Sequence, residues 1–294
     1  MHLKKISLIG AGLLGGSLGL AIRKRELSAR VHAYVRRAES VEECRRMGVA
    51  QLATQNIKEA VEGAELVILC TPLSQMRELT LQMRPYLAAG AVVTDVGSVK
   101  AGVVQELVPL LSKVKAMFVG SHPMAGSEKA GLAAARANLF ENAICLVTPT
   151  PQSPVCAVEA VQDFWKALGG CPVRMSPEMH DDLVSRSSHL PHVVAAELAN
   201  YVLSPAHPRE QAMVCASGFR DTTRIAASSP EMWRDVAMAN RKNLSRVLGV
   251  FIEDLQEFQL ALEREDAGAI EEFFTKARQR REKWRAHSDT MSAE

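Results

Sequence analysis

The sequence predicts a mostly parallel, doubly wound α/β sheet followed by an all-α helical domain, and three observations support this fold class. Short apolar runs alternate with amphipathic helical stretches over roughly the first 175 residues, and such alternation is typical of βαβ units on a parallel sheet. A glycine-rich segment stands between the first run and the first helical stretch. After about Ser176 only helical periodicity remains. We therefore expect two domains, covering residues 1–175 and 176–294.

The expected strands are short apolar runs, and the expected helices repeat apolar residues at three- and four-residue steps between them. The strand candidates are residues 6–9, 31–35, 66–70, 91–94, 117–119, 143–147 and 172–175. The helix candidates are residues 13–25, 74–87, 100–111 and 154–168. Strands and helices in this order predict a sheet that is covered by helices.

The predicted helical domain contains one long apolar stripe. Its members recur at helical spacing and are Leu244, Leu248, Phe251, Leu255, Phe258 and Leu262. Packing inside one subunit would explain such a stripe, but its length favours helix-to-helix contact between two copies, so we expect a homodimer. Upstream, Ser229, Pro230 and Glu231 predict a helix start, with an N-cap serine, a first-turn proline and an acid that complements the helix dipole.

Composition excludes several classes of partner. The 35 basic and 33 acidic residues nearly balance, which argues against a nucleic-acid surface. No apolar run approaches the roughly 18 residues of a membrane span, so we expect no membrane partner. The six cysteines show neither a CxxC pair nor metal-ligand spacing, which predicts no metal and a reducing, cytoplasmic compartment.

The glycine-rich segment, residues 10–15, is a GxGxxG motif between the first predicted strand and helix. Gly10, Gly12 and Gly15 allow a tight turn and let backbone N–H groups approach a pyrophosphate at the helix N-terminus, which Leu13 and Leu14 open. A tight turn without a ligand is the alternative, but strand, glycines and helix are all in register here. The motif predicts a bound dinucleotide.

The end of the second predicted strand indicates which dinucleotide binds. An acidic residue would be expected there to bind the ribose of NAD, but the position holds Val35, followed by Arg36 and Arg37. Guanidinium groups match the geometry of a phosphate, so this segment favours the 2′-phosphate of NADP, with NAD still possible. Solvated surface arginines are the alternative.

Two further segments end predicted strands, where ligands of open parallel sheets bind. Cys70, Thr71 and Pro72 follow one strand, and residues 94–100 follow the next. In the second segment, Ser98 is expected to cap a helix that starts at Val99 or the following lysine, and its hydroxyl can also bond a substrate hydroxyl.

His122 follows the apolar run of residues 117–120 and opens a turn bracketed by glycine and proline. Imidazole is the side chain best suited to accept a proton near neutral pH, and alcohol oxidation requires proton removal. A histidine that only satisfies backbone groups at a strand end is the alternative. The residues alone leave both open.

Five segments then occur in a specific order: GAGLLGGSLG, DVGSVK, SHPMAGSEKAG, HDDLVSRSSHLPH and GFRDTTRIA. Together they resemble the prephenate/arogenate dehydrogenase family of tyrosine biosynthesis, from Lys5 to about Arg285. The resemblance implies a Rossmann domain followed by a helical dimerisation domain. It also implies oxidative decarboxylation of prephenate and/or arogenate to 4-hydroxyphenylpyruvate and/or tyrosine, with hydride transfer to NAD(P)⁺.

The resemblance also implies roles for individual residues. His122 is the catalytic histidine, which accepts the hydroxyl proton or a hydrogen bond from it, and Ser98 orients His122 and the hydroxyl. Arg224 binds a substrate carboxylate, and we expect it to be buried because it lies between a threonine and an isoleucine. His180 is weighed only as a core or capping histidine.

The remaining implied residues line the substrate pocket where the two domains meet. His192 is expected nearer the substrate, His189 near an acidic gate residue matching Glu128, and Ser127 beside that gate. A metal pair is the alternative for the two histidines. Pro191 between them disrupts the helix ladder, however, and no carboxylate follows at the spacing of a zinc motif.

Two rival functions remain at this point. Another Rossmann-plus-helical hydroxyacid dehydrogenase would use a helical lysine as its acid/base, but only Lys100 and Lys129 are near, and neither lies in such a motif. A non-catalytic NADP-binding regulator would need none of His122, Ser98 and Arg224. Their joint presence therefore favours the enzyme.

Overall fold

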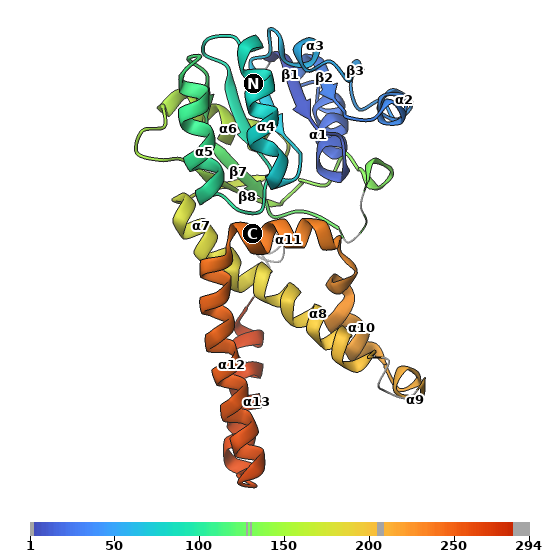
Figure 1. The fold of residues 1–294 in the computed structure, drawn as a ribbon, viewed down its shortest axis with the longest axis vertical. Coiled ribbons are helices and arrows are strands. Elements are labelled where there is room, and N and C mark those ends of the chain that lie inside the picture. The colour runs from blue at the N-terminus through green and yellow to red at the C-terminus, as the bar shows by residue number, and fades with distance from the viewer. Residues whose placement is uncertain (1–2, 128, 130, 205–208, 285–294) are drawn as a thin grey trace. The chain divides into compact units, whose positions relative to one another are not determined.

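The computed structural model describes residues 3–127, 129, 131–204 and 209–284. The chain forms two compact units, the first ending at Asn240 and the second beginning at Arg241. Figure 1 shows the elements in chain order. The first unit contains all the strands and the helices up to α11, and the second contains α12 and α13.

The main sheet of the first unit has six parallel strands in the order β3-β2-β1-β4-β5-β6. They are β1 (Leu3–Ile9), β2 (Ser28–Tyr34), β3 (Leu52–Thr54), β4 (Leu66–Leu69), β5 (Val92–Asp95) and β6 (Met117–Phe118). The strand order reverses between β1 and β4, and ligands of such sheets bind at this switch point. The predicted doubly wound fold is confirmed. β3 escaped prediction because it has only three residues.

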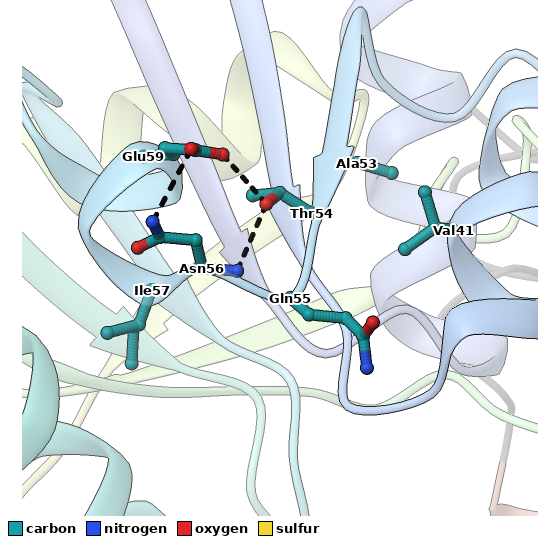
Figure 2. Close-up of a pocket in the computed structure, with 7 residues that line it drawn as sticks. All are labelled: Val41, Ala53, Thr54, Gln55, Asn56, Ile57 and Glu59. Carbon is teal, nitrogen blue, oxygen red and sulfur yellow. Dashed lines mark hydrogen bonds between the residues drawn. The ribbon is translucent and has the colours of Figure 1, made fainter.

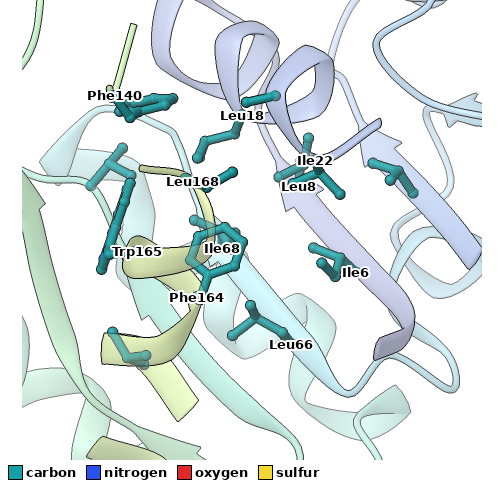
Figure 3. Close-up of a cluster of buried hydrophobic side chains, with 14 of the residues drawn as sticks. Ile6, Leu8, Leu18, Ile22, Leu66, Ile68, Phe140, Phe164, Trp165 and Leu168 are labelled. Atoms are coloured by element: carbon teal, nitrogen blue, oxygen red, sulfur yellow. The ribbon is translucent and has the colours of Figure 1, made fainter. Parts of the chain in front are cut away.

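Helices cover both faces of this sheet. Side chains from α1 (Leu13–Lys24) and α6 (Val155–Ala167) pack on one face, and Figure 3 shows this cluster with Leu18, Ile22, Phe164 and Trp165. The other face is covered from α3 (Ile57–Val61), α4 (Leu73–Met83) and α5 (Ala101–Ser112). Burying one such large side chain stabilises the fold by about 1.5–3 kcal/mol. The sheet edge that carries the site therefore has a rigid support. The remaining elements here are α2 (Ala38–Arg46) and the short helices η1 (Arg84–Tyr86) and η2 (Leu132–Ala134).

A second sheet of three strands follows the first in the chain. Its strands are β7 (Gly120–Pro123), β8 (Ile144–Thr148) and β9 (Cys171–Arg174), with β7 antiparallel and β9 parallel to β8. The sequence placed His122 where a turn begins. Instead the chain leaves β6 at Phe118 and enters β7, in which His122 is paired with Leu146. Strand pairing therefore fixes the backbone of this histidine.

Helices complete the first unit. They are α7 (Pro177–Val184), η3 (Ser185–His189), α8 (Leu190–Val202), α9 (Arg209–Met213), α10 (Ser217–Thr223), η4 (Arg224–Ala227) and α11 (Pro230–Ala239). The predicted start of α11 is confirmed, because the Ser229 side chain accepts a hydrogen bond from Met232 N. η3 is a π-helix, a rare form that is frequent at functional sites.

The second unit is a hairpin of α12 (Arg241–Glu263) and α13 (Ala267–Lys283). Phe258 of α12 packs against Phe273 of α13, with 4.6 Å between ring centroids. The predicted apolar stripe lies on α12. Its members Leu255 and Leu262 are exposed in the single chain, with 47% and 52% of their surface accessible. None of the helices in the described part of the chain is long and apolar enough to cross a membrane.

Candidate active site

The glycine loop between β1 and α1 is shaped to accept a ligand. Gly10 has φ +101°, and a Cβ there would lie 2.9 Å from the Cys70 carbonyl oxygen. A Cβ at Gly15 would lie 2.1 Å from the Gly10 carbonyl oxygen. At Gly12, by contrast, a Cβ would meet no atom within 4 Å. The first and third glycines are therefore needed for packing, and the middle one leaves open space at the helix N-terminus.

The first turn of α1 suits a pyrophosphate. Leu13 and Leu14 begin this helix, its N-cap Gly12 provides no side-chain cap, and the first turn contains no acidic residue. Its N–H groups are thus available to an anion. Thr71 adds a second sign of a ligand, because its Oγ1 is buried without a hydrogen-bond partner among the described residues. Cys70 follows β4 and Pro72 occupies the N-cap of α4, so both lie at the same edge of the sheet.

The chain segment after β2 forms the side of the site that would meet a ribose. Val35 is buried, whereas Arg36 and Arg37 are exposed. The Gln55 side chain donates a hydrogen bond of 2.8 Å to the Arg36 carbonyl and so holds this turn. Gln55 also lines a pocket of about 700 Å³ at the end of β3 (Figure 2). Both guanidinium groups are therefore presented to solvent beside a recess.

His122 belongs to a chain of hydrogen bonds between buried side chains. Its Nδ1 lies 2.9 Å from His180 Nε2, and His180 Nδ1 lies 2.8 Å from Asp181 Oδ1. His122 is 8% exposed and His180 is fully buried. Burial lowers the pKa of His122 well below its usual value, and the neighbouring His180, Lys100 and His189 lower it further. His122 is accordingly a neutral imidazole near neutral pH.

Asp181 is held by the start of α5. Its Oδ1 accepts a hydrogen bond from Lys100 N at 2.7 Å, and its Oδ2 accepts one from Ala101 N at 2.9 Å. Two backbone N–H groups at the start of the helix thus hold both carboxylate oxygens. Burial lowers the pKa of His180, and its bond to Asp181 acts in the opposite direction. Asp181 thus anchors one end of the chain of hydrogen bonds.

A buried ion pair holds the backbone of β7 at Ser121. The Lys100 ammonium contacts Asp95 Oδ2, both side chains are fully buried, and Lys100 Nζ also donates to the Ser121 carbonyl at 3.0 Å. Asp95 Oδ1 accepts a hydrogen bond from Ser121 N, and Oδ2 accepts one from Gly97 N. The pair therefore joins the end of β5 to the residue before His122. Because Lys100 is occupied in this way, it is not the lysine acid/base of the rival dehydrogenase class.

Ser98 does not cap a helix, so that part of the prediction is wrong. α5 begins at Ala101 with Lys100 as its N-cap residue, and Asp181 caps its amides. Ser98 lies in the bend between β5 and α5 and is half-buried. Within the described residues, the hydrogen-bond partner of His122 is His180 rather than Ser98. Asp181, which is 80 residues from Ala101 in the chain, provides the cap that was predicted for Ser98.

His189 is a buried side chain that lies near the backbone of Ser98. Asn240 Nδ2 donates to His189 Nδ1 at 3.1 Å and also to the Asp181 carbonyl at 2.8 Å. Burial lowers the pKa of His189 to about 4, although Asp181 and a backbone contact with Ser98 raise it in part. The ring is therefore neutral, with its proton on Nε2, and it helps to brace the site.

His192, Trp233 and Arg224 lie close together, and we refer to them as the His192 group. The His192 ring stacks on Trp233 with 3.8 Å between centroids, and its Nδ1 bonds the Ser188 carbonyl at 2.8 Å. Burial lowers the pKa of His192, and the charge of Arg224 lowers it further, which places the two close together. Arg224 itself is exposed, so the expectation that it is buried is wrong. It lies at the start of η4, on the surface of the first unit.

The loop after β7 contains the remaining predicted residues. Ser127 is exposed, and its hydroxyl accepts a hydrogen bond from Lys129 N at 3.1 Å, so it points back onto its own loop. Glu128 lies outside the described residues. In the part of the chain that the structure describes, no group of three or more His, Cys, Asp or Glu side chains is placed to hold a metal ion.

Four site residues were not identified as such from sequence. They are His180, Asp181, Trp233 and Asn240. The first two lie in the HDDLVSRSSHLPH segment, so a histidine beside two acids was a usable signal. Asn240 and Trp233 reach the site only because α11 folds back, and no local pattern indicates that contact.

Fold and site together define a nicotinamide-dependent dehydrogenase, with an open glycine loop on a doubly wound sheet and a buried, neutral histidine next to the end of β5. Two family models match the chain: "Prephenate dehydrogenase, nucleotide-binding domain" over residues 18–173, and "Prephenate dehydrogenase, dimerization domain" over residues 176–276. The chain therefore belongs to the prephenate dehydrogenase family.

Individual relatives agree with this assignment. The chain is 33% identical over 280 residues to the cyclohexadienyl dehydrogenase of Zymomonas mobilis, covering 95% of each protein. It is 37% identical over 287 residues to the prephenate dehydrogenase of Bacillus subtilis, covering 94% of this chain and 75% of that protein. Its fold matches a prephenate dehydrogenase from A. aeolicus, solved with hydroxyphenyl propionate and NAD⁺. That match has a TM-score of 0.89 and 30% identity, and it covers 96% and 98% of the two chains.

Proposed function

We propose that this protein catalyses the oxidative decarboxylation of prephenate and/or arogenate to 4-hydroxyphenylpyruvate and/or tyrosine in tyrosine biosynthesis, with hydride transfer to NAD(P)⁺. One observation carries the proposal most directly. A neutral, buried His122 is held in place next to the carboxyl end of β5, on the edge of the sheet that also carries the open glycine loop. A proton acceptor beside a dinucleotide site is what oxidation of a ring hydroxyl requires.

Different residues of the chain are assigned to different steps of this reaction. The bound nicotinamide supplies the hydride acceptor. His122 accepts the ring hydroxyl proton, or a hydrogen bond from it, as charge develops on the oxygen. The hydroxyl of Ser98 lies on the neighbouring segment and orients the substrate hydroxyl. Loss of the ring carboxylate as CO₂ then leaves an aromatic ring, which drives the reaction forward.

We assign binding of the substrate carboxylates to the His192 group. Arg224 provides a cation near His192, and a guanidinium pairs with a carboxylate through two hydrogen bonds. Nε1 of Trp233 is buried without a hydrogen-bond partner among the described residues, so it is a further donor for this anion. Ser127 and Glu128 remain assigned to substrate binding, with Glu128 as the acidic gate residue. His189 is assigned to bracing, because its ring contacts Asn240 and the Ser98 backbone.

For the cofactor we propose a preference for NADP over NAD. The support is the pair of exposed guanidinium groups at Arg36 and Arg37, after a strand end that has valine in place of an acid. Arg36→Ala should raise the KM for NADP by about tenfold and leave the KM for NAD nearly unchanged. Arg46→Ala, an exposed arginine in α2, is the matched control. A wild-type protein that prefers NAD would overturn this preference.

We further propose that the cofactor-binding domain ends near residue 175, that two copies associate through α12 and α13, and that the protein is cytoplasmic. The support for association is the exposed apolar stripe of α12 together with the match to a dimerization-domain model. The cytoplasmic location is supported by the reaction itself, which would require the nicotinamide nucleotides of the cell.

The decisive experiment measures reduced nicotinamide by absorbance after prephenate or arogenate is added with each cofactor. Turnover of at least one cyclohexadienol is expected. His122→Asn should abolish turnover while dinucleotide binding, measured by calorimetry, stays unchanged. Turnover of neither substrate by the wild-type protein would refute the proposed function, as would full activity in the variant.

A further inference from the structure

We propose that His180 and Asp181 are positioning residues for the proposed reaction: they fix His122 in the tautomer that has its proton on Nδ1 and its lone pair on Nε2. The inference rests on the proposed function for its catalytic meaning, but the tautomer itself is a property of the resting protein. It concerns two side chains that touch neither substrate nor cofactor and act only through His122.

The tautomer follows from counting donors and acceptors. Both oxygens of Asp181 already accept hydrogen bonds, from Lys100 N and Ala101 N, so His180 Nδ1, 2.8 Å from Oδ1, must be a donor and carry a proton. A neutral His180 then has a lone pair on Nε2. Since His122 Nδ1 lies 2.9 Å from that atom, it must be the donor. The unprotonated nitrogen of a neutral His122 is therefore Nε2.

The surroundings keep both rings neutral. His122 faces His180, Lys100 and His189, and none of these favours a second proton on it. The charged groups that act on His180 are Asp181, Lys100 and Asp95. The Lys100 ammonium is balanced by Asp95, which leaves Asp181 as the charge available to the histidine pair. In the transition state, a proton arriving at His122 Nε2 is stabilised through His180 by this carboxylate.

Rigid attachment makes this arrangement effective. The backbone of His122 is paired in β7 with Leu146. Asp181 is attached to the first turn of α5, and its backbone carbonyl accepts a further hydrogen bond from Asn240. Both ends of the chain of hydrogen bonds are therefore anchored, and its middle ring is fully buried. A water molecule bonded to His122 Nδ1 would impose no such choice of tautomer.

Replacing Asp181 with asparagine tests the idea most sharply. With its NH2 group in place of Oδ1, the amide loses the bond from Lys100 N, keeps its oxygen on Ala101 N and donates to His180 Nδ1. In that orientation His180 is protonated on Nε2 and forces His122 into the opposite tautomer, with no lone pair left for the substrate. We expect kcat to fall by about 10² to 10⁴ while KM stays within about threefold. Loss of the carboxylate should also move the acidic limb of the pH profile to lower pH, because imidazolium loses its stabilising charge. Asp182→Asn, at the half-buried neighbouring position, where the carboxylate pairs with Arg186 instead, should change neither quantity.

Two variants of His180 separate orientation from mere packing. His180→Gln places an amide oxygen near the former Nε2, where it can still accept from His122 Nδ1. His180→Asn is too short to do so. Glutamine should therefore retain at least about tenfold more kcat than asparagine, although glutamine loses the bond to Asp181, which the Nδ2 group of asparagine can still donate. Equal activity of the two variants would contradict the proposal.

The direct measurement is the histidine tautomer by long-range ¹H–¹⁵N correlation spectroscopy on the full-length resting protein, with His122 assigned by its absence in His122→Gln. The expected signal is Nδ1–H in the wild type and Nε2–H in Asp181→Asn. Nε2–H in the wild type would overturn the inference even if an Asp181 variant failed to fold. Because no substrate is present, this result stands apart from any failure of the proposed activity.

Discussion

Replacing Lys100 with methionine perturbs the buried ion pair under β7, and its cost can be worked out from the structure. The substitution removes the ammonium but nearly keeps the volume, so Asp95 stays fully buried with only its two backbone donors, Gly97 N and Ser121 N. Breaking a buried pair in this way costs about 3–5 kcal/mol. Since the whole fold is stable by about 5–15 kcal/mol, this is a large fraction.

Urea unfolding followed by circular dichroism measures that loss at pH 7. The control is Lys113→Met, an exposed lysine directly after the same helix, which should change the unfolding free energy by less than about 0.5 kcal/mol. Adding Asp95→Asn to Lys100→Met should recover part of the loss, because the buried charge is then gone. If Lys100→Met unfolds within about 1 kcal/mol of the wild type, the pair does not hold β5 and Ser121 as argued.

Three further outcomes are expected. Gly12→Ala should fold normally and raise the dinucleotide dissociation constant at least about tenfold. Gly15→Ala should fail to fold, because its Cβ, unlike that of Gly12→Ala, would collide with the backbone. Normal dinucleotide binding by Gly12→Ala would contradict this prediction. The neutral form of His189 predominates in the fold down to about pH 4, so acidification from pH 6.5 to 4 should cost about 3 kcal/mol that His189→Asn does not lose; parallel unfolding curves for the two proteins would refute it. Leu255→Glu should yield monomers in sedimentation, and an intact dimer would exclude α12 as the interface.

The strands of the fold were predictable where burial on both faces of a sheet produces a continuous apolar run in the sequence. All seven predicted strands exist, and helix starts such as Ser229 follow from local capping rules. β3 is too short to show a pattern. β7 was read as a turn because its glycine and proline, which usually interrupt strands, stand at the two ends of a strand. Short strands are stabilised by their neighbours rather than by their own residues.

The site was predictable only where chemistry and local structure coincide. His122 and the glycine loop carry their signal in adjacent residues: the structure places the loop between β1 and α1, and it places His122 in β7, next to the end of β5. The capping role given to Ser98 was wrong because Asp181 supplies the cap across 80 residues. The burial expected for Arg224 was wrong because apolar neighbours in a short helix do not determine what covers it. Both errors concern contacts between segments that are distant in the chain.

The double attachment of Asp181, to the amides of α5 and to His180, has a consequence for how this enzyme can change over time. Cofactor recognition is encoded before the His-Asp pair, and the basicity of His122 is encoded within it. A recombination event that exchanged the segment from Ser176 onward for one without this pair would leave a protein that still takes up its dinucleotide. On the role proposed above for His180 and Asp181, such a protein would be catalytically silent.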